Sequence, residues 1–534
     1  MKRKIEDISG GYHIRAMSTI QLNEREKQLK GLLLDVASYI NKAPDRKDAE
    51  PLILRWAGGW VRDKVLGIES HDIDTAINSM TGFPFATKMR EFCEDAANVE
   101  KHSIRPEDVG NLYKVAANPD KSKHLETATV RMFGVEVDFV NLRKETYTED
   151  SRNPQIEFGT AEEDALRRDA TVNALFYNLH TDEIEDFTGG MKDMKRKVIR
   201  TPLEPLQTFT DDPLRVLRLV RFASRLEFTI DPASERAMED QRVLDALKLK
   251  ISRERVGIEV EKMLKGNHPC ESLRFIDRLH LYNTIFTDPS KADMARPDTL
   301  KWQAAYECLQ YLEDDRSSAS IYSTLVSTEE GSYCAWVLAA LTPWESVPDP
   351  APPARGKTPP PPITLAAREG IKAPNRLCDL VTAAHRHRPE IMGLKQAVYE
   401  QKKDFTNERD RLGMPIRRWE DRGVDWKLQV LYAILTEVMA SESQVARDEI
   451  LASWEEFLKH IRALDLMEAP SIKRLIDGHQ LGSALGIKPG KWMAPALDVC
   501  MAWQLRHPGE TDMSGAVEEV RSRREELGIA GLLK

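Results

Sequence analysis

Two aspartates one residue apart, Asp72 and Asp74, are the first side chains whose types and spacing could do chemistry. Residues two apart in a strand share a face, so both carboxylates would point to one place. Mg²⁺ prefers such oxygen ligands and completes its shell with water and substrate phosphates. Taken alone, an Asp-x-Asp pair is more often part of a solvated loop. An EF-hand is excluded because Ala76 and Ile77 stand where that loop needs an oxygen ligand and a glycine.

A Gly-Gly turn precedes the aspartates. Gly58 and Gly59 follow a predicted buried strand and open a short predicted helix over 60–66. Backbone N–H groups can approach phosphates closely at such a turn, and a helix N-terminus favours anions. Arg62 and Asp63 follow in the helix, where Arg62 would either brace the turn or neutralise phosphate charge.

A third group contains Arg167, Arg168, Asp169 and Asn173. One interpretation is a helix of surface charges, with Asp169 and Asn173 at i,i+4 spacing. The other is nucleotide binding, in which an Asp or Asn contacts a ribose 2′-OH and the arginines contact a triphosphate.

A fourth group begins at Asp212, where an acceptor followed by proline has the form of a helix start. Arg215, Arg218 and Arg221 then lie near one face, either as a solvated stripe or as a binding surface. Asp212 and Arg215, three apart, would present an acceptor beside a donor. Cytosine and adenine carry the complementary groups, whereas uracil and guanine reverse them. The pair could therefore select CTP and ATP without a nucleic-acid template.

The elements that must position these groups change in character along the chain. Strands are predicted over 53–57, 73–77, 127–133 and 135–140. After about residue 203 helices take over, and they are predicted over 214–226, 252–265, 301–312, 396–411 and 444–464.

Two segments have the composition of loops. The polar stretch 101–123 has no period and is predicted to be a long loop, of the kind that forms a lid, a binding loop or a disordered segment. The stretch 347–362 holds eight prolines and predicts an extended linker.

Five motifs in this order resemble the tRNA nucleotidyltransferases of the second class, the CCA-adding enzymes of eukaryotic type in the DNA polymerase β superfamily. The motifs are Ala57-Gly-Gly-Trp-Val-Arg-Asp-Lys-Val-Leu-Gly67 with Asp72-Ile-Asp-Thr-Ala76, Arg167-Arg-Asp-Ala-Thr-Val-Asn-Ala-Leu175, Asp186-Phe-Thr-Gly-Gly-Met-Lys-Asp193, Asp211-Asp-Pro-Leu-Arg-Val-Leu-Arg-Leu-Val-Arg221 and Glu254-Arg-Val-Gly-Ile-Glu-Val-Glu261. One departure is Asp211, because the base-selecting motif of this family more usually opens Glu-Asp.

The resemblance implies an α+β fold: a polymerase-β-like nucleotidyltransferase head with a mixed sheet, followed by an all-helical neck, body and tail. The implied divisions are an N-terminal extension and first helix over 1–48, the head over 49–200, the neck over 201–268, the body with its proline-rich loop over 269–400 and the tail over 401–534.

The resemblance also implies the activity, which is template-independent addition of C, C and A to the 3′ end of tRNA from CTP and ATP. Asp72 and Asp74 would hold two Mg²⁺ ions. Asp138 is a candidate third metal ligand, or else a solvent-facing strand residue. The other implied nucleotide-binding residues are Gly58, Gly59, Arg62, Asp63, Arg167, Arg168, Asp169, Asn173, Asp211, Asp212, Arg215, Arg218 and Arg221.

The implied partner is tRNA, held at its 3′ end and along its outer helix and elbow, with no obligatory protein partner and no membrane. The implied location is the cytoplasm, with nuclear and mitochondrial pools as further options. Arg417-Arg418-Trp419 and His385-Arg-His-Arg388 are candidate tRNA contacts, or else ordinary surface clusters. Alternative functions are a poly(A) polymerase, a partial CC- or A-adding enzyme, and a non-catalytic RNA-binding scaffold.

Composition narrows the function classes further. A net charge of −9 excludes a protein held to nucleic acid by bulk charge. The six cysteines form no CxxC pair, which argues against a disulfide framework or a zinc site. The longest apolar run, 333–341, is far shorter than a membrane span.

Overall fold

The computed structural model describes residues 20–70, 72–115, 127–148, 151–291, 295–352, 358–402, 407–420 and 423–529. His71, residues 116–123 of the polar stretch and residues 353–357 of the proline-rich stretch therefore lie outside the described part. The chain forms two compact units, Met1–Glu259 and Val260–Lys534. The finer division into five parts stays a prediction.

A seven-stranded mixed sheet forms the centre of the first unit, in the order β3-β4-β5-β2-β1-β8-β9. Strand β2 pairs antiparallel with β1 and parallel with β5, so it lies in the middle of the sheet. The strands are β1 (Leu54–Ala57), β2 (Asp72–Ile77), β3 (Val109–Val115), β4 (Thr127–Met132), β5 (Val135–Asn141), β8 (Leu175–Asn178) and β9 (Glu183–Asp186).

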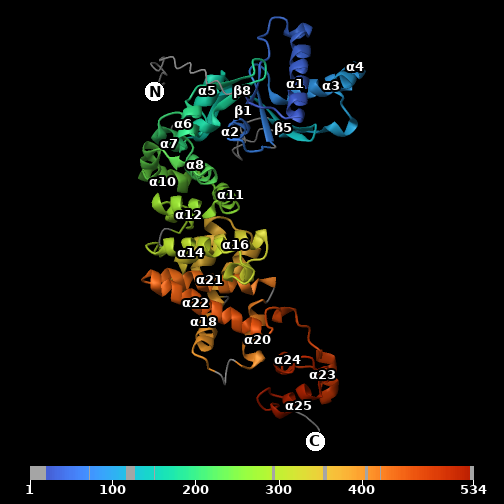
Figure 1. The fold of residues 1–534 in the computed structure, drawn as a ribbon, viewed down its shortest axis with the longest axis vertical. Coiled ribbons are helices and arrows are strands. Elements are labelled where there is room, and N and C mark those ends of the chain that lie inside the picture. The colour runs from blue at the N-terminus through green and yellow to red at the C-terminus, as the bar shows by residue number, and fades with distance from the viewer. Residues whose placement is uncertain are drawn as a thin grey trace. The chain divides into compact units, whose positions relative to one another are not determined.

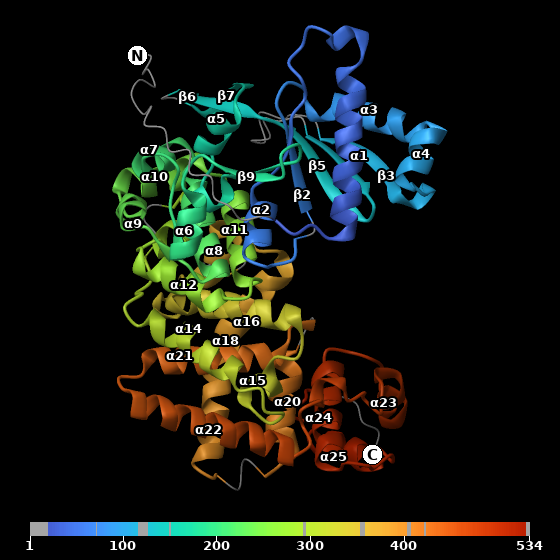
Figure 2. The same cartoon turned by 45° about the horizontal axis from the view of Figure 1, so that its top comes forward.

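Helices α1 (Glu24–Asn41) and α3 (Gly82–Glu94) cover one face of this sheet (Figure 2). The ring centroids of Phe85 and Phe139 lie 5.0 Å apart in this core. Gly82 allows the close approach of α3 to β5, because a Cβ there would lie 2.0 Å from the Phe139 carbonyl oxygen.

The opposite face of the sheet is covered over part of its area. The short helix α5 (Ala161–Leu166) packs there through Ala161 and Ala165 against Ala57, Ala76 and Phe176. Asp72 and Asp74, at the start of β2, stay exposed beside this cluster.

The predicted strands are confirmed within one or two residues at each end. The prediction of a loop over 101–123 is wrong for part of its length, because helix α4 (Ala96–His102) runs into it and β3 pairs with β4. β3 is an edge strand, and its polar residues face solvent instead of a core, so the pattern lacked an apolar period.

The helices that follow the sheet in the first unit are α6 (Gly190–Arg196), α7 (Pro205–Asp211), α8 (Leu214–Leu226), α9 (Pro232–Met238), α10 (Gln241–Lys250) and α11 (Arg253–Leu264), whose last residues enter the second unit. The predicted basic helix is confirmed as α8, which buries Leu217 and Val220 and leaves its arginines on the other face. A two-residue pair, β10 (Val198–Ile199) with β11 (Thr229–Ile230), interrupts these helices.

In its described residues the second unit is helical (Figure 1). Its longer helices are α12 (Pro269–Arg278), α14 (Trp302–Asp314), α16 (Glu329–Leu341), α18 (Asn375–Tyr399), α20 (Arg409–Trp419), α21 (Trp426–Ala440), α22 (Gln444–Ala463), α23 (Gly478–Leu485), α24 (Met493–Arg506) and α25 (Ser514–Ser522). The mixed-sheet head followed by helices confirms the predicted fold class.

The predicted helix over 396–411 is wrong. Helix α18 ends at Tyr399 and α20 begins at Arg409, and Gln401 has a left-handed backbone with φ of 52°. Of the helices that the structure describes, none combines the length and apolarity needed to cross a membrane.

Candidate active site

Three carboxylates lie on one face of the sheet where β2 and β5 run side by side. Asp74 lies directly opposite Asp138 in the parallel pair, and Asp72 precedes Asp74 by two residues on the same face. The Thr129 hydroxyl donates a hydrogen bond to Asp138. Solvent reaches Asp74, but the protein around it raises the pKa of this carboxyl, and the negative charges of Asp138 and Asp72 raise it further. A divalent cation would relieve this repulsion.

The donor set fits Mg²⁺ in its chemistry, since it consists of carboxylate oxygens that face solvent and can be joined by water and phosphate ligands. Within the described ranges, no three Asp, Glu, His or Cys side chains converge on a metal-sized space by themselves. Asp72 and Asp74 are the residues that would hold the ion, and Asp138 is the third candidate.

Gly58 holds the turn before α2 (Gly59–Val65) close to these carboxylates. Its backbone has φ of 71°, and its N–H donates to the carbonyl of Leu175 at 3.0 Å. A Cβ on Gly58 would lie 2.9 Å from Nη1 of Arg168 and 3.9 Å from Oδ2 of Asp74. Only glycine satisfies both the backbone conformation and this crowding.

Asp164 on α5 anchors both arginines of the second motif. Its carboxylate accepts hydrogen bonds from Arg167 at 2.5 and 2.9 Å and from Arg168 at 2.9 and 3.1 Å. Burial favours the neutral acid, but the charges of Arg168 and Arg167 outweigh this and lower the pKa of Asp164. Sequence reasoning missed Asp164, although its i,i+3 and i,i+4 spacing to the arginines was a usable signal.

Glu145 on strand β6 (Arg143–Thr148), which pairs with β7 (Ser151–Phe158), is a second missed residue. Its Oε1 accepts from Arg143 at 2.7 Å and from Arg167 at 3.2 Å, and its Oε2 lies 3.9 Å from Nη2 of Arg215. One buried carboxylate thus links arginines from two separate motifs.

A second buried chain of polar groups runs from α2 to α8. Arg62 donates to the side-chain oxygen of Asn173 at 2.5 Å, Asn173 donates to Asp169 at 3.5 Å, and Arg218 donates to Asp169 at 2.5 Å. Burial alone would raise the pKa of Asp169, but Arg218 outweighs it and lowers this pKa to about 2. Asp169 is therefore not a free surface charge. Nor is it a binding residue without a partner in the protein.

Asp63 is buried between two arginines. It accepts from Nε of Arg62 at 2.7 Å and from Nη2 of Arg225 at 3.5 Å. Burial lowers the pKa of Arg62, while the charge of Asp63 opposes this effect. Asp63 thus holds Arg62 next to Gly59. A Cβ placed on Gly59 would lie 3.6 Å from Nη2 of Arg62.

The base-selecting candidates lie at the junction of α7 and α8. Asp212 accepts from the N–H of Leu214 at 3.3 Å, which confirms its place at the helix start, and it lies 3.8 Å from Arg255. Arg215 donates to the carbonyl of Arg167 at 2.8 Å. Asp212 and Arg215 are thus three residues apart on the chain, and each is oriented by a different neighbour.

The flanking residues of this motif have structural partners. Asp211 accepts from Gln207 at 2.6 Å, and burial raises its pKa. Arg221 donates to Glu259 at 2.7 Å, and its guanidinium carbon lies 4.5 Å from the Phe222 ring centroid.

Several side chains of the two candidate tRNA clusters have partners within the helical unit. Trp419 is 1% exposed and donates to Glu390 at 2.7 Å, and Arg417 donates to the carbonyls of Ala469 and Ile472. His385 contacts Glu345 at 2.8 Å. Trp419, Arg417 and His385 thus have partners within the protein, which differs from the alternative of ordinary surface clusters. A contact of these clusters with tRNA stays a prediction.

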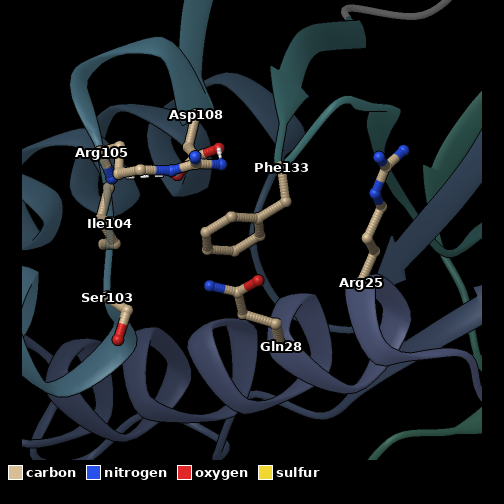
Figure 3. A pocket seen from close by; sticks show the side chains of 7 residues that line it. All are labelled: Arg25, Gln28, Ser103, Ile104, Arg105, Asp108 and Phe133. Carbon is tan, nitrogen blue, oxygen red and sulfur yellow. Dashed lines mark hydrogen bonds and ion pairs between the residues drawn. The ribbon is translucent and has the colours of Figure 1, made fainter.

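A cavity of about 510 Å³ lies on another part of the head, between α1, the segment after α4 and the turn from β4 to β5 (Figure 3). Its lining is Arg25, Gln28, Ser103, Ile104, Arg105, Asp108 and Phe133. No predicted site residue lines it, so the cavity and the charged network are separate features.

Sequence comparisons match two families. The family described as Poly A polymerase head domain matches residues 54–200, and the one described as probable RNA and SrmB-binding site of polymerase A matches residues 227–293. A protein of Purpureocillium lilacinum named nucleotidyltransferase lcsQ is 52% identical over 99% of this chain and 98% of its own length. The mitochondrial CCA tRNA nucleotidyltransferase of Candida glabrata is 38% identical over 92% of this chain and 94% of its own.

Solved structures agree with the sequence matches at the level of the fold. The Thermotoga maritima CCA-adding enzyme in complex with tRNA aligns with a TM-score of 0.60 and 19% identity, over 95% of this chain and 98% of that one.

Proposed function

The chain belongs to the family of the CCA tRNA nucleotidyltransferases, and from this premise we propose that it adds C, C and A to the 3′ end of tRNA from CTP and ATP, releasing pyrophosphate. The observation that carries the proposal is the opposition of Asp74 and Asp138 across β2 and β5, beside the turn at Gly58 and the guanidinium of Arg168. Carboxylate oxygens that can bind cations thus lie beside N–H groups that can bind phosphates.

Asp72, Asp74 and Asp138 present the oxygen ligands for two Mg²⁺ ions. When bound there, the ions would lower the pKa of the RNA 3′-OH and neutralise the departing pyrophosphate. The protein's own part is to hold three carboxylates on one face of the sheet, on the neighbouring strands β2 and β5.

The arginines next to the carboxylates would bind the triphosphate. Arg168 lies beside Gly58 and is held by Asp164 and by the Asn173 carbonyl at 3.1 Å, so its charge is fixed before substrate arrives. The backbone at Gly58 and Gly59 can approach phosphate oxygens from the same side. Asp169 and Asn173, which are held by Arg218 and Arg62, would contact the ribose.

Base selection would fall to Asp212 and Arg215. The carboxylate accepts from the exocyclic amino group of cytosine or adenine, and the guanidinium donates to the neighbouring ring nitrogen. Uracil and guanine would place a carbonyl oxygen against the carboxylate. Arg215 is oriented for this role by the Arg167 carbonyl, which couples the base site to the triphosphate site.

The proposed partner is tRNA, and the proposed locations are the cytoplasm together with the mitochondrion, for which the Candida glabrata relative is named. No residue of the helical unit is assigned to tRNA contact.

The experiment that tests the function is nucleotide incorporation on a tRNA transcript lacking its last three residues, with products read at single-nucleotide resolution. Growth by two residues with CTP, and by three with CTP and ATP, is the expected result. A long tail from ATP alone would make the protein a poly(A) polymerase, and a stop at two residues would make it a CC-adding enzyme. If the protein binds this tRNA but adds no nucleotide, the remaining interpretation is a non-catalytic RNA-binding scaffold.

The variant Asp74→Ala tests the metal assignment. It should abolish incorporation while tRNA binding stays within about twofold, because the carboxylate is exposed at the reaction centre and supports no core contact. Asp48→Ala, at an exposed position outside the site, is the control. Retained incorporation by Asp74→Ala would remove this residue from the mechanism.

A further inference from the structure

The face of the sheet that carries Asp74 continues past β5 to the edge of the sheet. In the registers of the paired strands, Asp74 lies opposite Asp138, Asp138 opposite Thr129, and Thr129 opposite Tyr113. Directly opposed residues of neighbouring strands point to the same side. Tyr113 on β3 therefore lies on the same face as the proposed metal ligands, about 14 Å away across three strand spacings.

This part of the face is open, while the opposite side of the same strands is buried. Tyr113 is 62% exposed, and Arg131 on β4 is also exposed, whereas their neighbours Val130 and Ala128 on the other side are fully buried. Among the described residues, no hydrogen bond is found for the side chain of Tyr113. The structure thus keeps a large aromatic ring in solvent at the level of the reaction centre, and the described part of the chain offers it no side-chain partner.

The positions of the cationic groups give the reaction a direction. The cationic group described next to Asp74 comes from the β1 side: Nη1 of Arg168, at the end of α5, lies beside Gly58 and Asp74. Arg131 on β4 lies two strands away from Asp74, opposite Glu136. The triphosphate, and so the leaving pyrophosphate, belongs on the β1 side. Attacking and leaving oxygens are roughly in line in nucleotidyl transfer. The 3′-OH of the RNA must then approach from the β5 side, and the base of its terminal nucleotide extends toward β4 and β3.

We propose that Tyr113 is a positioning residue for the RNA primer, whose 3′-terminal base stacks on its ring while the 3′-OH lies at Asp74 and Asp138. The inference rests on the proposed function and adds to it the place of the second substrate. Stacking on an aromatic ring tolerates any base. This suits an enzyme whose primer terminus changes with every nucleotide that it adds, because a hydrogen-bonding site for one base would reject the next.

The test compares Tyr113→Ala, Tyr113→Phe and the unchanged protein in single CTP additions. The tRNA transcript is supplied in two forms, one with an intact 3′-terminal nucleotide and one with an abasic ribose at that position. On the intact primer, Tyr113→Ala should raise KM for tRNA about 5- to 150-fold, the range that stacking of one base contributes, and should leave KM for CTP within twofold. Tyr113→Phe should stay within about threefold of the unchanged protein.

The abasic primer separates stacking from any structural effect of the substitution. With no base to stack, the unchanged protein and Tyr113→Ala should have the same KM for the primer. A loss of the same size on both primers, or no loss on the intact one, would overturn the proposal. Tyr311→Ala removes a tyrosine that is 68% exposed in the helical unit and is the matched control, with both KM values expected within twofold.

The failure of this inference is distinguishable from failure of the proposed function. If the unchanged protein extends neither primer, the proposed function is wrong. If it extends the intact primer and Tyr113→Ala does so with equal KM, the function stands and the stacking role is removed.

Discussion

Arg168 and Asp164 are joined twice, because Nε and Nη2 of Arg168 lie 3.1 and 2.9 Å from one carboxylate oxygen of Asp164. The remaining nitrogen, Nη1, donates to the carbonyl of Asn173. Every nitrogen of the guanidinium is therefore fixed by the protein, and its charge is presented beside Gly58 and Asp74. A group held in this way loses little freedom when a phosphate binds.

Removal of Asp164 should be costly. Asp164→Ala leaves Arg167 and Arg168 largely buried without their shared carboxylate, so the free energy of unfolding of the first unit should fall by about 3 kcal/mol. Urea unfolding measures this. Glu162→Ala, exposed on the same helix, is the control and should change stability by less than about 0.5 kcal/mol. The double variant Asp164→Ala, Arg168→Ala should recover part of the loss, and strict additivity would contradict the pairing.

Gly58→Ala should inactivate the enzyme, and Gly67→Ala should not. Both glycines have a positive φ, 71° and 72°, so alanine at either position strains the backbone, and more so at Gly58, whose ψ of −126° lies outside the left-handed helical region. Only at Gly58 does the new Cβ meet Arg168 and Asp74, whereas nothing lies within 4 Å at Gly67. Incorporation rates should fall about 100-fold or more for Gly58→Ala and stay within threefold for Gly67→Ala. Equal activities would show that the crowding has no bearing on catalysis.

Arg215→Ala should blunt nucleotide selectivity. The discrimination of CTP against UTP, taken as the ratio of kcat/KM values, should fall about 10- to 100-fold because the donor that rejects the wrong base is lost. Competition between labelled CTP and UTP measures this ratio. Arg242→Ala, which removes an exposed arginine paired only with Asp240 2.7 Å away, provides the comparison. Unchanged discrimination by Arg215→Ala would remove the pairing scheme.

Asp169 should make the stability of the head depend on pH in the acid range. Its pKa is lowered to about 2 in the folded protein from an ordinary value near 3.8, mainly by Arg218 against the effect of burial. The charged carboxylate therefore stabilises the fold above about pH 4, and this contribution, about 2 kcal/mol, disappears as the pH falls toward 2.

The comparison of unchanged protein with Asp169→Asn isolates this effect. The difference between their free energies of unfolding should be largest at pH 5 to 6 and should shrink by about 2 kcal/mol on approach to pH 2, as followed by urea unfolding at each pH. A difference that is independent of pH would show that Asp169 and Arg218 are not coupled in the folded protein.

Much of the head could be predicted because its signals are local. The alternation of buried and exposed residues around Asp72 and Asp74, and the proline after Asp212, define a strand and a helix start without knowledge of the rest of the fold. The bounds of α8 could likewise be predicted from the apolar residues along one face of that helix.

Glu145, unlike the other missed residue Asp164, depends on contacts between distant segments. Glu145 acquires its role only when β6 brings it to Arg167 and Arg215, and no spacing in the sequence encodes that meeting. Asp138 could be named as a candidate, but its place opposite Asp74 follows from a parallel pairing whose register is a tertiary property.

The end of α18 shows a different limit. No Gly or Pro marks the segment after Tyr399, and Gln401 still adopts a left-handed conformation. Helical propensity around it was favourable, and the exposed residues at the break offer no packing reason for it in the described part of the chain. Strand β3 was missed for a different reason. It lies at the edge of the sheet, and Tyr113 and its neighbours lack the apolar face of a covered strand.

The order of the sheet has a consequence for synthesis on the ribosome. Strand β1 pairs with β2 early in the chain, but its other neighbour, β8, is made only after β2 through β7 have been translated. Until Phe176 emerges, Ala57 has no partner on that side, and the Gly58 N–H lacks the Leu175 carbonyl that holds it. A nascent chain therefore carries the strand of Asp72 and Asp74 long before the turn beside it can close, and a chaperone that protects the open edge of β1 would act during that interval.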